Sequence, residues 1–299
     1  MTSPSLSSQL TSAEVKPSEA MIDSPTLPAE YVGLFERKLR ARTPRNLLAP
    51  LTGLVNGVID LGLFGTSPLQ THVVMCGFPR SGSTLCQLMV EACVKGVRTF
   101  GRERPAYEIV RTSLRNHRYL FSKWPRDIYF IEDIRKFYAS RRTNVKFVLF
   151  NRDPRAVLTS HHVRRPDDYY VSVARWREIY PFWNWAKQAS DVTTIRYEDL
   201  VTEPESVQKR LAELIGWEVT RPFADFYQAV PRTFDAAALN GVRPLSTHNI
   251  ERWRDPKYTE RLRSLIQTEM PELCDRLMEF GYEDDDRWAD PYRTASRAA

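Results

Sequence analysis

Short apolar runs alternate with helical patterns from residue 72 onward. Apolar runs at 72–77 (HVVMCG), 146–151 (KFVLFN) and 192–197 (VTTIRY) predict strands, because buried parallel strands are nearly continuous apolar segments. Helical patterns that close on a glycine follow the first run at 83–96 and the third run before Gly216. Strands that alternate with helices predict a parallel sheet, so we expect a three-layer α/β fold.

The pattern changes at both ends of the chain. Residues 1–27 are rich in Ser, Thr and Pro and are expected to form a disordered tail. An N-terminal helical segment is expected over 28–70, followed by the main domain over 71–285. That domain is expected to end in one helix from about 256 to 280, with Gly281 as its stop. Residues 286–299 are expected to be a flexible tail.

The most apolar early segment is LTGLVNGVIDLGLFGT (51–66). Asn56, Asp60 and four glycines interrupt it, so it is too short and too polar to span a bilayer. It is expected either to pack on the core or to lie on the surface. Residues 1–27 lack the basic start and apolar stretch of a secretory signal. We therefore expect a cytoplasmic protein with no transmembrane segment.

Composition narrows the class of ligand. The chain has 299 residues, 42% of them hydrophobic, and a net charge of +6. This charge suggests an anionic ligand and is too small to indicate nucleic acid, which is not expected as a partner. The four cysteines are Cys76, Cys86, Cys93 and Cys274. No metal-type spacing occurs among them, so they are expected to be small buried hydrophobic residues rather than disulfide partners or zinc ligands.

The first strand runs into the loop GFPRSGST (77–84), which nearly matches the phosphate-binding pattern G-x-x-x-x-G-K-S/T. Ser83 stands where the lysine is expected, and Arg80 is the only cation in the loop. A glycine turn before a helix N-terminus binds anions through its N–H groups and the helix dipole. Loss of the lysine argues against a triphosphate and favours a donor with a single 5′-phosphate. The candidate ligand-binding residues are Pro79, Arg80, Ser81, Gly82, Ser83 and Thr84.

A second candidate phosphate site follows the strand at 146–151. Arg152 stands at the strand end, and Asp153 and Pro154 are suited to the N-cap and first position of a helix that continues through 163. A planar guanidinium there suits bidentate phosphate binding. Ser160 follows eight residues after Arg152.

Together these stretches resemble a known family. VVMCGFPRSGSTL (73–85) resembles the 5′-phosphosulfate loop of sulfotransferases that use 3′-phosphoadenosine 5′-phosphosulfate (PAPS), and NRDPRAVLTS (151–160) resembles their 3′-phosphate motif. IRYEDL is similar to the family's strand whose tyrosine approaches the adenine, here Tyr197. HNIERWRD is similar to the closing loop, in which Arg252, or alternatively Arg254, would contact the 3′-phosphate. The resemblance covers about residues 72–282.

The resemblance implies transfer of a sulfuryl group from PAPS to a hydroxyl or amine of a carbohydrate, glycolipid or small metabolite, without a metal. Arg80 would stabilise the charge that develops on the departing 5′-phosphate. Two alternatives stay open: an ATP-dependent P-loop kinase, and an inactive nucleotide-binding protein of the same fold. The aromatic stretch 169–185 has helical spacing, so core packing is its first interpretation, and some of its rings could line an acceptor pocket.

The resemblance also requires a general base. The Lys-Thr-His stretch of the cytosolic branch is absent, since FSKWPRD (121–127) has Lys123 and no histidine. The tyrosylprotein branch has a glutamate shortly after the first helix, and Glu103 stands at a comparable place. Glu103 is therefore the leading candidate. The other candidates are Glu108, Asp127 and His117, while His161 and His162 lie directly after Ser160 and either face the acceptor or are exposed on a helix.

Overall fold

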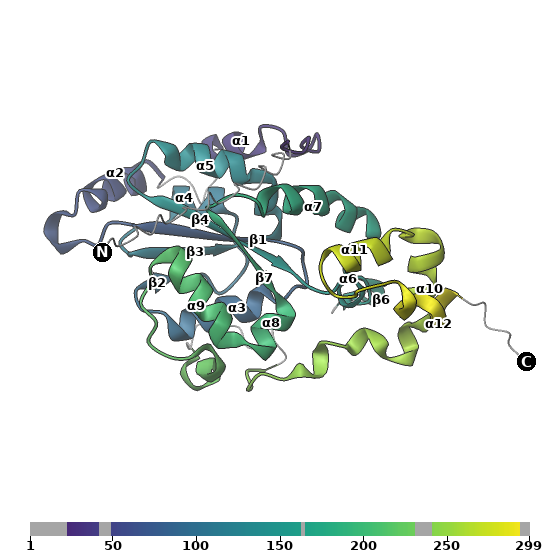
Figure 1. Cartoon of the computed structure of the whole chain (residues 1–299). Helices are drawn as coiled ribbons and strands as arrows, with labels where there is room; N and C mark the ends of the chain where they lie inside the picture. Colours follow the sequence, from purple (N-terminus) through teal and green to yellow (C-terminus); the bar gives the residue numbers. More distant parts are fainter. Residues whose placement is uncertain (1–22, 42–48, 163–164, 231–240, 294–299) are drawn as a thin grey trace, which may run out of the picture.

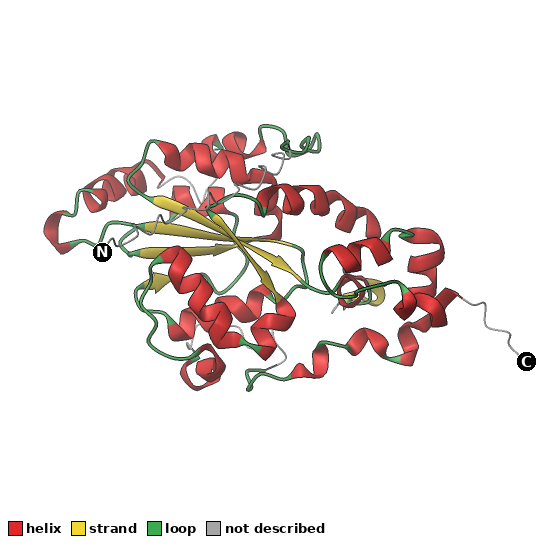
Figure 2. Cartoon of the chain, in the orientation of Figure 1, coloured by secondary structure: helices red, strands yellow, loops and turns green. Residues whose placement is uncertain are grey.

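The computed structural model describes residues 23–41, 49–162, 165–230 and 241–293. Its centre is a five-stranded sheet of order β2-β3-β1-β4-β7, in which every neighbouring pair is parallel (Figures 1 and 2). The strands are β1 (Thr71–Gly77), β2 (Val97–Arg98), β3 (Tyr119–Lys123), β4 (Asn144–Asn151) and β7 (Val192–Arg196). The predicted α/β fold with a central parallel sheet is confirmed.

Helices cover both faces of this sheet, because successive residues of a strand point to opposite sides. In β1, Val74 packs into one apolar core and Val73 into the other; in β4, Phe147 and Val148 divide in the same way. Residues of α1 (Leu34–Arg40), α4 (Ala106–Thr112), α5 (Ile131–Ala139) and α7 (Val173–Ala186) complete the first core. Residues of α3 (Ser83–Cys93), α8 (Tyr197–Thr202) and α9 (Pro204–Ile215) complete the second.

The predicted helix after Arg152 is shorter than expected. Asp153 does cap it, accepting a hydrogen bond from the Arg155 backbone N–H at 2.8 Å, but α6 (Pro154–Leu158) ends after five residues. The Ser160 carbonyl instead accepts the Tyr170 N–H at 2.8 Å. The chain then forms an antiparallel hairpin from β5 (His161–His162) and β6 (Arg165–Tyr169). The prediction of a continuous helix through 163 is therefore wrong.

The long C-terminal helix is also interrupted. It divides into η8 (Pro256–Tyr258), α10 (Thr259–Ser264), a π-helical turn η9 (Leu265–Glu269) and α11 (Leu273–Glu279). Pro271 explains the break, because a residue that precedes proline is disfavoured in the α conformation, and Met270 adopts φ −145° and ψ 67°. Gly281 stops α11 as predicted, with φ 68°.

The two ends of the described chain pack on the domain. Residues Arg287–Ala289 (η10) and Asp290–Arg293 (α12) are helical, and Trp288 meets Trp253 edge-on at 6.0 Å, which differs from the flexible tail expected there. Residues 294–299, and 1–22 of the expected N-terminal tail, lie outside the described residues. The four cysteines are free and buried, as predicted.

The apolar segment 51–66 lies on the surface. It forms α2 (Ala49–Asp60) and the short helix η2 (Leu63–Gly65), beside the amino-terminal end of β1. Within the described part of the chain, none of the helices combines the length and apolar character needed to cross a membrane.

Candidate active site

The turn between β1 and α3 requires both of its glycines. Gly77 has φ 115°, and a Cβ there would lie 2.7 Å from the Phe150 carbonyl oxygen of β4. Gly82 has φ 84°, and its Cβ would lie 2.3 Å from Cδ2 of Tyr197. Arg80 also has a positive φ, 64°, which a side chain tolerates only at a cost of about 1 kcal/mol. The loop is therefore held in a strained form by contacts with β4 and α8.

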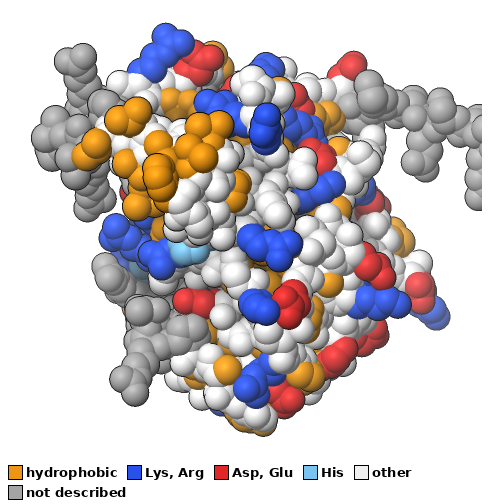
Figure 3. Space-filling view, turned by 90° about the vertical axis from the view of Figure 1, so that its left-hand side faces the viewer, with side chains coloured by type: hydrophobic (Ala, Val, Ile, Leu, Met, Phe, Trp, Pro, Cys, Tyr) orange, Lys and Arg blue, Asp and Glu red, His pale blue; other side chains and the backbone are white. Residues whose placement is uncertain are grey.

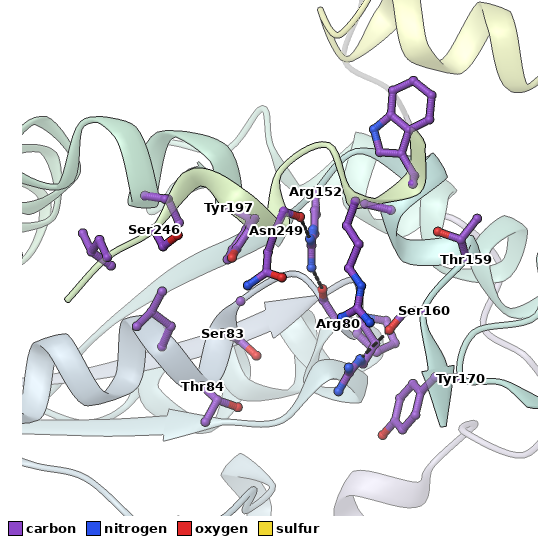
Figure 4. Close-up of a pocket in the computed structure, with 18 of the residues that line it drawn as sticks. Arg80, Ser83, Thr84, Arg152, Thr159, Ser160, Tyr170, Tyr197, Ser246 and Asn249 are labelled. Atoms are coloured by element: carbon purple, nitrogen blue, oxygen red, sulfur yellow. Dashed lines mark hydrogen bonds between the residues drawn. The ribbon is translucent and has the colours of Figure 1, made fainter. Parts of the chain in front are cut away.

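A cavity of about 540 Å³ lies over this loop at the carboxyl ends of the strands. Its walls include five of the six predicted loop residues: Pro79, Arg80, Gly82, Ser83 and Thr84. Ser81 is the exception, because its side chain is buried and its hydroxyl donates to the Phe78 carbonyl. Figure 4 shows Ser83 and Thr84 at the start of α3 and Arg80 across the cavity from them. Five residues of the sequence motif thus face one cavity, and Ser81 holds the turn.

Arg152 extends from the end of β4 into the same cavity. Its Nη1 donates to the Arg80 carbonyl at 3.3 Å and its Nη2 donates to the Asn249 carbonyl at 2.6 Å (Figure 4). Its guanidinium lies over the Tyr197 ring at 4.2 Å. Its buried Nε has no hydrogen-bond partner among the described residues. A buried donor without a partner is costly, so the geometry favours an acceptor group at this point.

Ser160, the other residue of the second motif, lies beside Arg80. Its Oγ accepts a hydrogen bond from Arg80 Nε at 2.9 Å, and the Arg80 guanidinium lies 5.4 Å from the centre of the Tyr170 ring. Arg80 and Ser160 are thus brought together although they belong to separate motifs.

The cavity is electrostatically positive. Arg80, Arg152, Arg243 and Arg252 all line it, and no salt bridge to Arg80, Arg152 or Arg252 is found in the described ranges. Burial lowers the pKa of Arg80, the Tyr170 phenol opposes this change, and Arg152 and Arg252 lower the pKa further. Like charges held close together repel one another, so an anionic ligand is favoured here.

Arg252 and Arg254 differ clearly in their surroundings. Arg252 lines the cavity, whereas Arg254 is exposed and pairs with Glu251 at 3.1 Å. Tyr197 and Trp253 are both buried, and both also line the cavity. The Trp253 ring lies against the guanidinium of Arg155, at 3.8 Å.

A lysine reaches the loop from the neighbouring strand. Lys123, the last residue of β3, donates from Nζ to Thr84 Oγ1 at 2.8 Å and lies 3.7 Å from Glu103 Oε1. Burial lowers the pKa of Lys123, and the Glu103 carboxylate partly opposes this effect. β3 therefore brings a cation next to the loop, whose own sequence lacks the lysine. Its one sign in the sequence is a lysine at the end of a short apolar run.

The candidate bases are placed very differently. Glu103 lines the cavity, and its side chain is 47% exposed. Glu108 is held by Arg104 at 2.9 Å. Asp127 is fully buried below the surface of the cavity, where its Oδ2 accepts the Ala106 backbone N–H at 3.0 Å and burial raises its pKa well above the usual range. His117 precedes β3, so it lies near the amino-terminal ends of the strands, opposite the cavity.

Tyr170, Tyr258 and His161 add aromatic side chains to the cavity wall. His161 lines the cavity in β5, with the rings of Tyr169 and Tyr258 at 4.8 and 5.8 Å from its own. Tyr170 also lines the cavity. Trp176 and Trp183 of the predicted helical stretch instead pack in the core, as their spacing indicates.

Most of the chain matches one known protein family. The family model described as sulfotransferase domain matches residues 70–270. Among solved structures, the sulfotransferase domain from the Synechococcus PCC 7002 olefin synthase is 16% identical, with a TM-score of 0.49, covering 72% of this chain and 96% of that chain. The sulfotransferase domain from the curacin biosynthetic pathway is 16% identical, with a TM-score of 0.43, covering 73% and 99%. A search of curated proteins finds no match. Since the family model spans more than half of its length, the chain belongs to the sulfotransferase domain family.

Proposed function

We propose that this chain transfers a sulfuryl group from PAPS to a hydroxyl or amine of a small-molecule or glycan acceptor, without a metal. The observation that carries the proposal is the pair of arginines, Arg80 and Arg152, that converge on a glycine loop without a lysine of its own. Both lack a carboxylate partner among the described residues, so they are available to bind two phosphate esters.

The residues present suit the chemistry of PAPS, which carries two separate anionic groups. The loop from Pro79 to Thr84, excluding the Ser81 side chain, would hold the 5′-phosphosulfate. Arg152, Ser160 and Arg252 would hold the 3′-phosphate, and the unpartnered Nε of Arg152 is a donor suited to it. Tyr197 would form the wall beside the adenine. Bound there, PAPS would supply the activated sulfuryl group.

The chain's own residues account for the remaining steps. Arg80 would stabilise negative charge on the departing phosphate, in a site where its charge is only partly screened by water. Glu103 would accept the proton of the acceptor, and the neighbouring Lys123 ammonium would orient its carboxylate. Glu103 is preferred over Glu108 and Asp127 because it combines a position on the cavity wall with an exposed carboxylate.

Ligand-dependent thermal stability tests the donor site. Adenosine 3′,5′-bisphosphate without metal is expected to raise the melting temperature by mass action, equivalent to about 2.7 kcal/mol at a hundredfold excess over Kd. ATP with Mg²⁺ is expected to have a much smaller effect, and the reverse order would favour the kinase alternative. A panel of sugars, glycolipids, phenols and small alcohols incubated with labelled PAPS then tests the transfer, read as the mass gain of one sulfate. Binding without any mass gain would favour an inactive nucleotide-binding protein.

A further inference from the structure

The helix α2 leaves most of its apolar side chains in solvent. Its polar Asn56 is buried, donating from Nδ2 to the Ser113 carbonyl at 3.1 Å and accepting the Arg115 N–H at 2.8 Å. Of its apolar residues Ile59 is buried, whereas Leu54 is 70% and Leu51 58% exposed. A surface helix ordinarily buries its apolar stripe, so this arrangement leaves an apolar face without a partner among the described residues.

The segment after α2 extends this face into a projecting tip. Phe64 is 92% exposed, the highest value among the large hydrophobic side chains that the structure exposes, and Leu61 and Leu63 beside it are also exposed. Phe64 adopts a positive φ of 56° in a turn flanked by Gly62 and Gly65. A strained backbone that presents an aromatic ring to water is a feature associated with functional sites. We call Leu51, Leu54, Val55, Leu61, Leu63 and Phe64 the apolar face.

Cations lie directly beside this apolar face. Arg118 and Arg142 line a surface cavity that also includes Asp60 and Leu61. Asp60 is neutralised by Arg115 at 2.7 Å, and Arg118 donates to the side-chain oxygen of Gln70 at 3.3 Å and lies 5.6 Å from the centre of the Tyr119 ring. Across the described ranges, neither Arg118 nor Arg142 forms a salt bridge. Figure 3 faces this end of the molecule and shows the hydrophobic side chains gathered in one patch, with Lys and Arg side chains beside it.

We propose that the apolar face docks the protein onto a lipid bilayer that contains anionic headgroups. Phe64 and Leu63 would enter the boundary between headgroups and acyl chains, while Arg118 and Arg142 would contact lipid phosphates. A second copy of the chain fits less well. A two-fold symmetric contact through this face would place the same arginines near one another, and a projecting tip offers little flat area.

The orientation of such a docked molecule follows from the sheet. The apolar face precedes the first residue of β1, whereas the candidate active site begins at its last residue, Gly77. A strand of this length separates them by about 20 Å. The cavity would therefore open away from the bilayer, toward acceptors in water or on structures that project from the membrane.

Vesicle flotation of the full chain tests the proposal. Wild type is expected to float with phosphatidylcholine vesicles that contain phosphatidylserine, and much less with phosphatidylcholine alone. The double variant Leu63→Ser/Phe64→Gly is expected to bind at least about tenfold more weakly, because it removes two inserted side chains. Glycine at 64 relieves the positive φ, so loss of folding is not expected, and an unchanged melting temperature checks this point.

Two further variants separate the contribution of the arginines to membrane binding from that of the apolar face. Arg118→Gln/Arg142→Gln is expected to abolish the preference for phosphatidylserine and the salt dependence of binding. Met278→Ser, which removes an exposed apolar side chain on α11, is the matched control and is expected to bind as wild type does. Failure of wild type to float, or equal loss with Met278→Ser, overturns the proposal. So does a wild-type dimer in solution that Leu63→Ser/Phe64→Gly converts to a monomer.

Discussion

The guanidinium of Arg80 donates from Nε to Oγ of Ser160 at 2.9 Å, across 80 residues of sequence. This contact aims Arg80 across the cavity from the start of α3. Arg80→Ala is expected to lower kcat by about 10²–10³-fold and to change the affinity for adenosine 3′,5′-bisphosphate much less, because its charge acts mainly on the transition state. Ser160→Ala is expected to cost less, since Arg80 keeps its charge. Steady-state kinetics with an identified acceptor, together with calorimetry, measure both effects. Equal losses of affinity and kcat in Arg80→Ala would contradict the assignment.

Arg152 is expected to contribute mainly to donor affinity. Arg152→Ala removes a guanidinium that bridges two loop carbonyls, and a lost charge-assisted bond costs roughly 1.5–3 kcal/mol, or about 10–100-fold in Kd. Arg254→Ala is the matched control, because Arg254 is exposed and paired with Glu251. Titration calorimetry with adenosine 3′,5′-bisphosphate measures the difference. Similar affinities of the two variants would remove Arg152 from the donor site.

Glu103 is expected to be required for turnover. Glu103→Gln keeps the size of the side chain but cannot accept a proton, so kcat is expected to fall by about 10²–10⁴-fold, with donor affinity retained. Glu108→Gln, in the same segment but held by Arg104, is expected to keep most of the activity. Rates measured across the pH range test this. Full turnover by Glu103→Gln would contradict its role as the base and would favour His161, the histidine on the cavity wall.

Gly82 is expected to be required for stability as well as for binding. Gly82→Ala would place a Cβ 2.3 Å from Tyr197 at a φ of 84°, and we expect the free energy of unfolding to fall by about 1–3 kcal/mol. Gly216→Ala is an informative control, since Gly216 has a similar φ of 77° but open space around its Cβ position. Urea unfolding of the two variants separates backbone strain from the clash. Equal losses of unfolding free energy in the two variants would show that the clash with Tyr197 adds nothing to the backbone strain.

His72 is expected to make the fold sensitive to acid. It is buried between the Tyr138 hydroxyl and Ser122 Oγ, at 2.8 and 2.9 Å, and burial lowers its pKa to about 3 from 6.5, assisted by Arg115. The folded state therefore keeps His72 neutral while the unfolded state binds a proton below 6.5. Since the unfolded state binds more protons, stability is lost as pH falls through this window, by about 1.4 kcal/mol per pH unit.

The comparison of His72→Gln with wild type isolates this contribution, because glutamine can replace hydrogen bonds but does not titrate. Urea unfolding between about pH 7 and about pH 4 is expected to show a shallower slope in the variant. Parallel slopes in the two proteins would mean that His72 becomes protonated without unfolding.

The central strands could be predicted because their residues are buried on both faces of the sheet, which makes β1 and β4 nearly continuous apolar runs. β3 escaped prediction because it ends in Ser122 and Lys123, whose polar groups are satisfied by His72, Thr84 and Glu103 on other parts of the chain. A sequence pattern does not show such tertiary partners. The same reason explains why α6 was expected to be longer: the carbonyl of Ser160 pairs with Tyr170 across a hairpin.

Some residues of the candidate site could likewise be predicted from the sequence, and others could not. Arg80, Ser83 and Arg152 belong to short local motifs that follow strand ends, and all three line the cavity. Lys123 and Asn249 lie next to the site residues because of contacts between segments that are far apart in the sequence. Asn249 contributes a main-chain carbonyl to Arg152, and a carbonyl leaves no signature in the type of residue. The side chain of Ser81 was assigned to the ligand because a loop motif does not show which hydroxyl turns inward.

The two hydrogen bonds of Arg152 join segments that are 72 and 97 residues away along the chain. A phosphate ester held by the same guanidinium would act as a non-covalent cross-link between the glycine loop, the end of β4 and the segment that follows residue 241. None of these three segments could then open alone without releasing it. Binding of a ligand in the pocket and the cooperative opening of these segments would therefore be coupled, and the position of a single side chain would set that coupling.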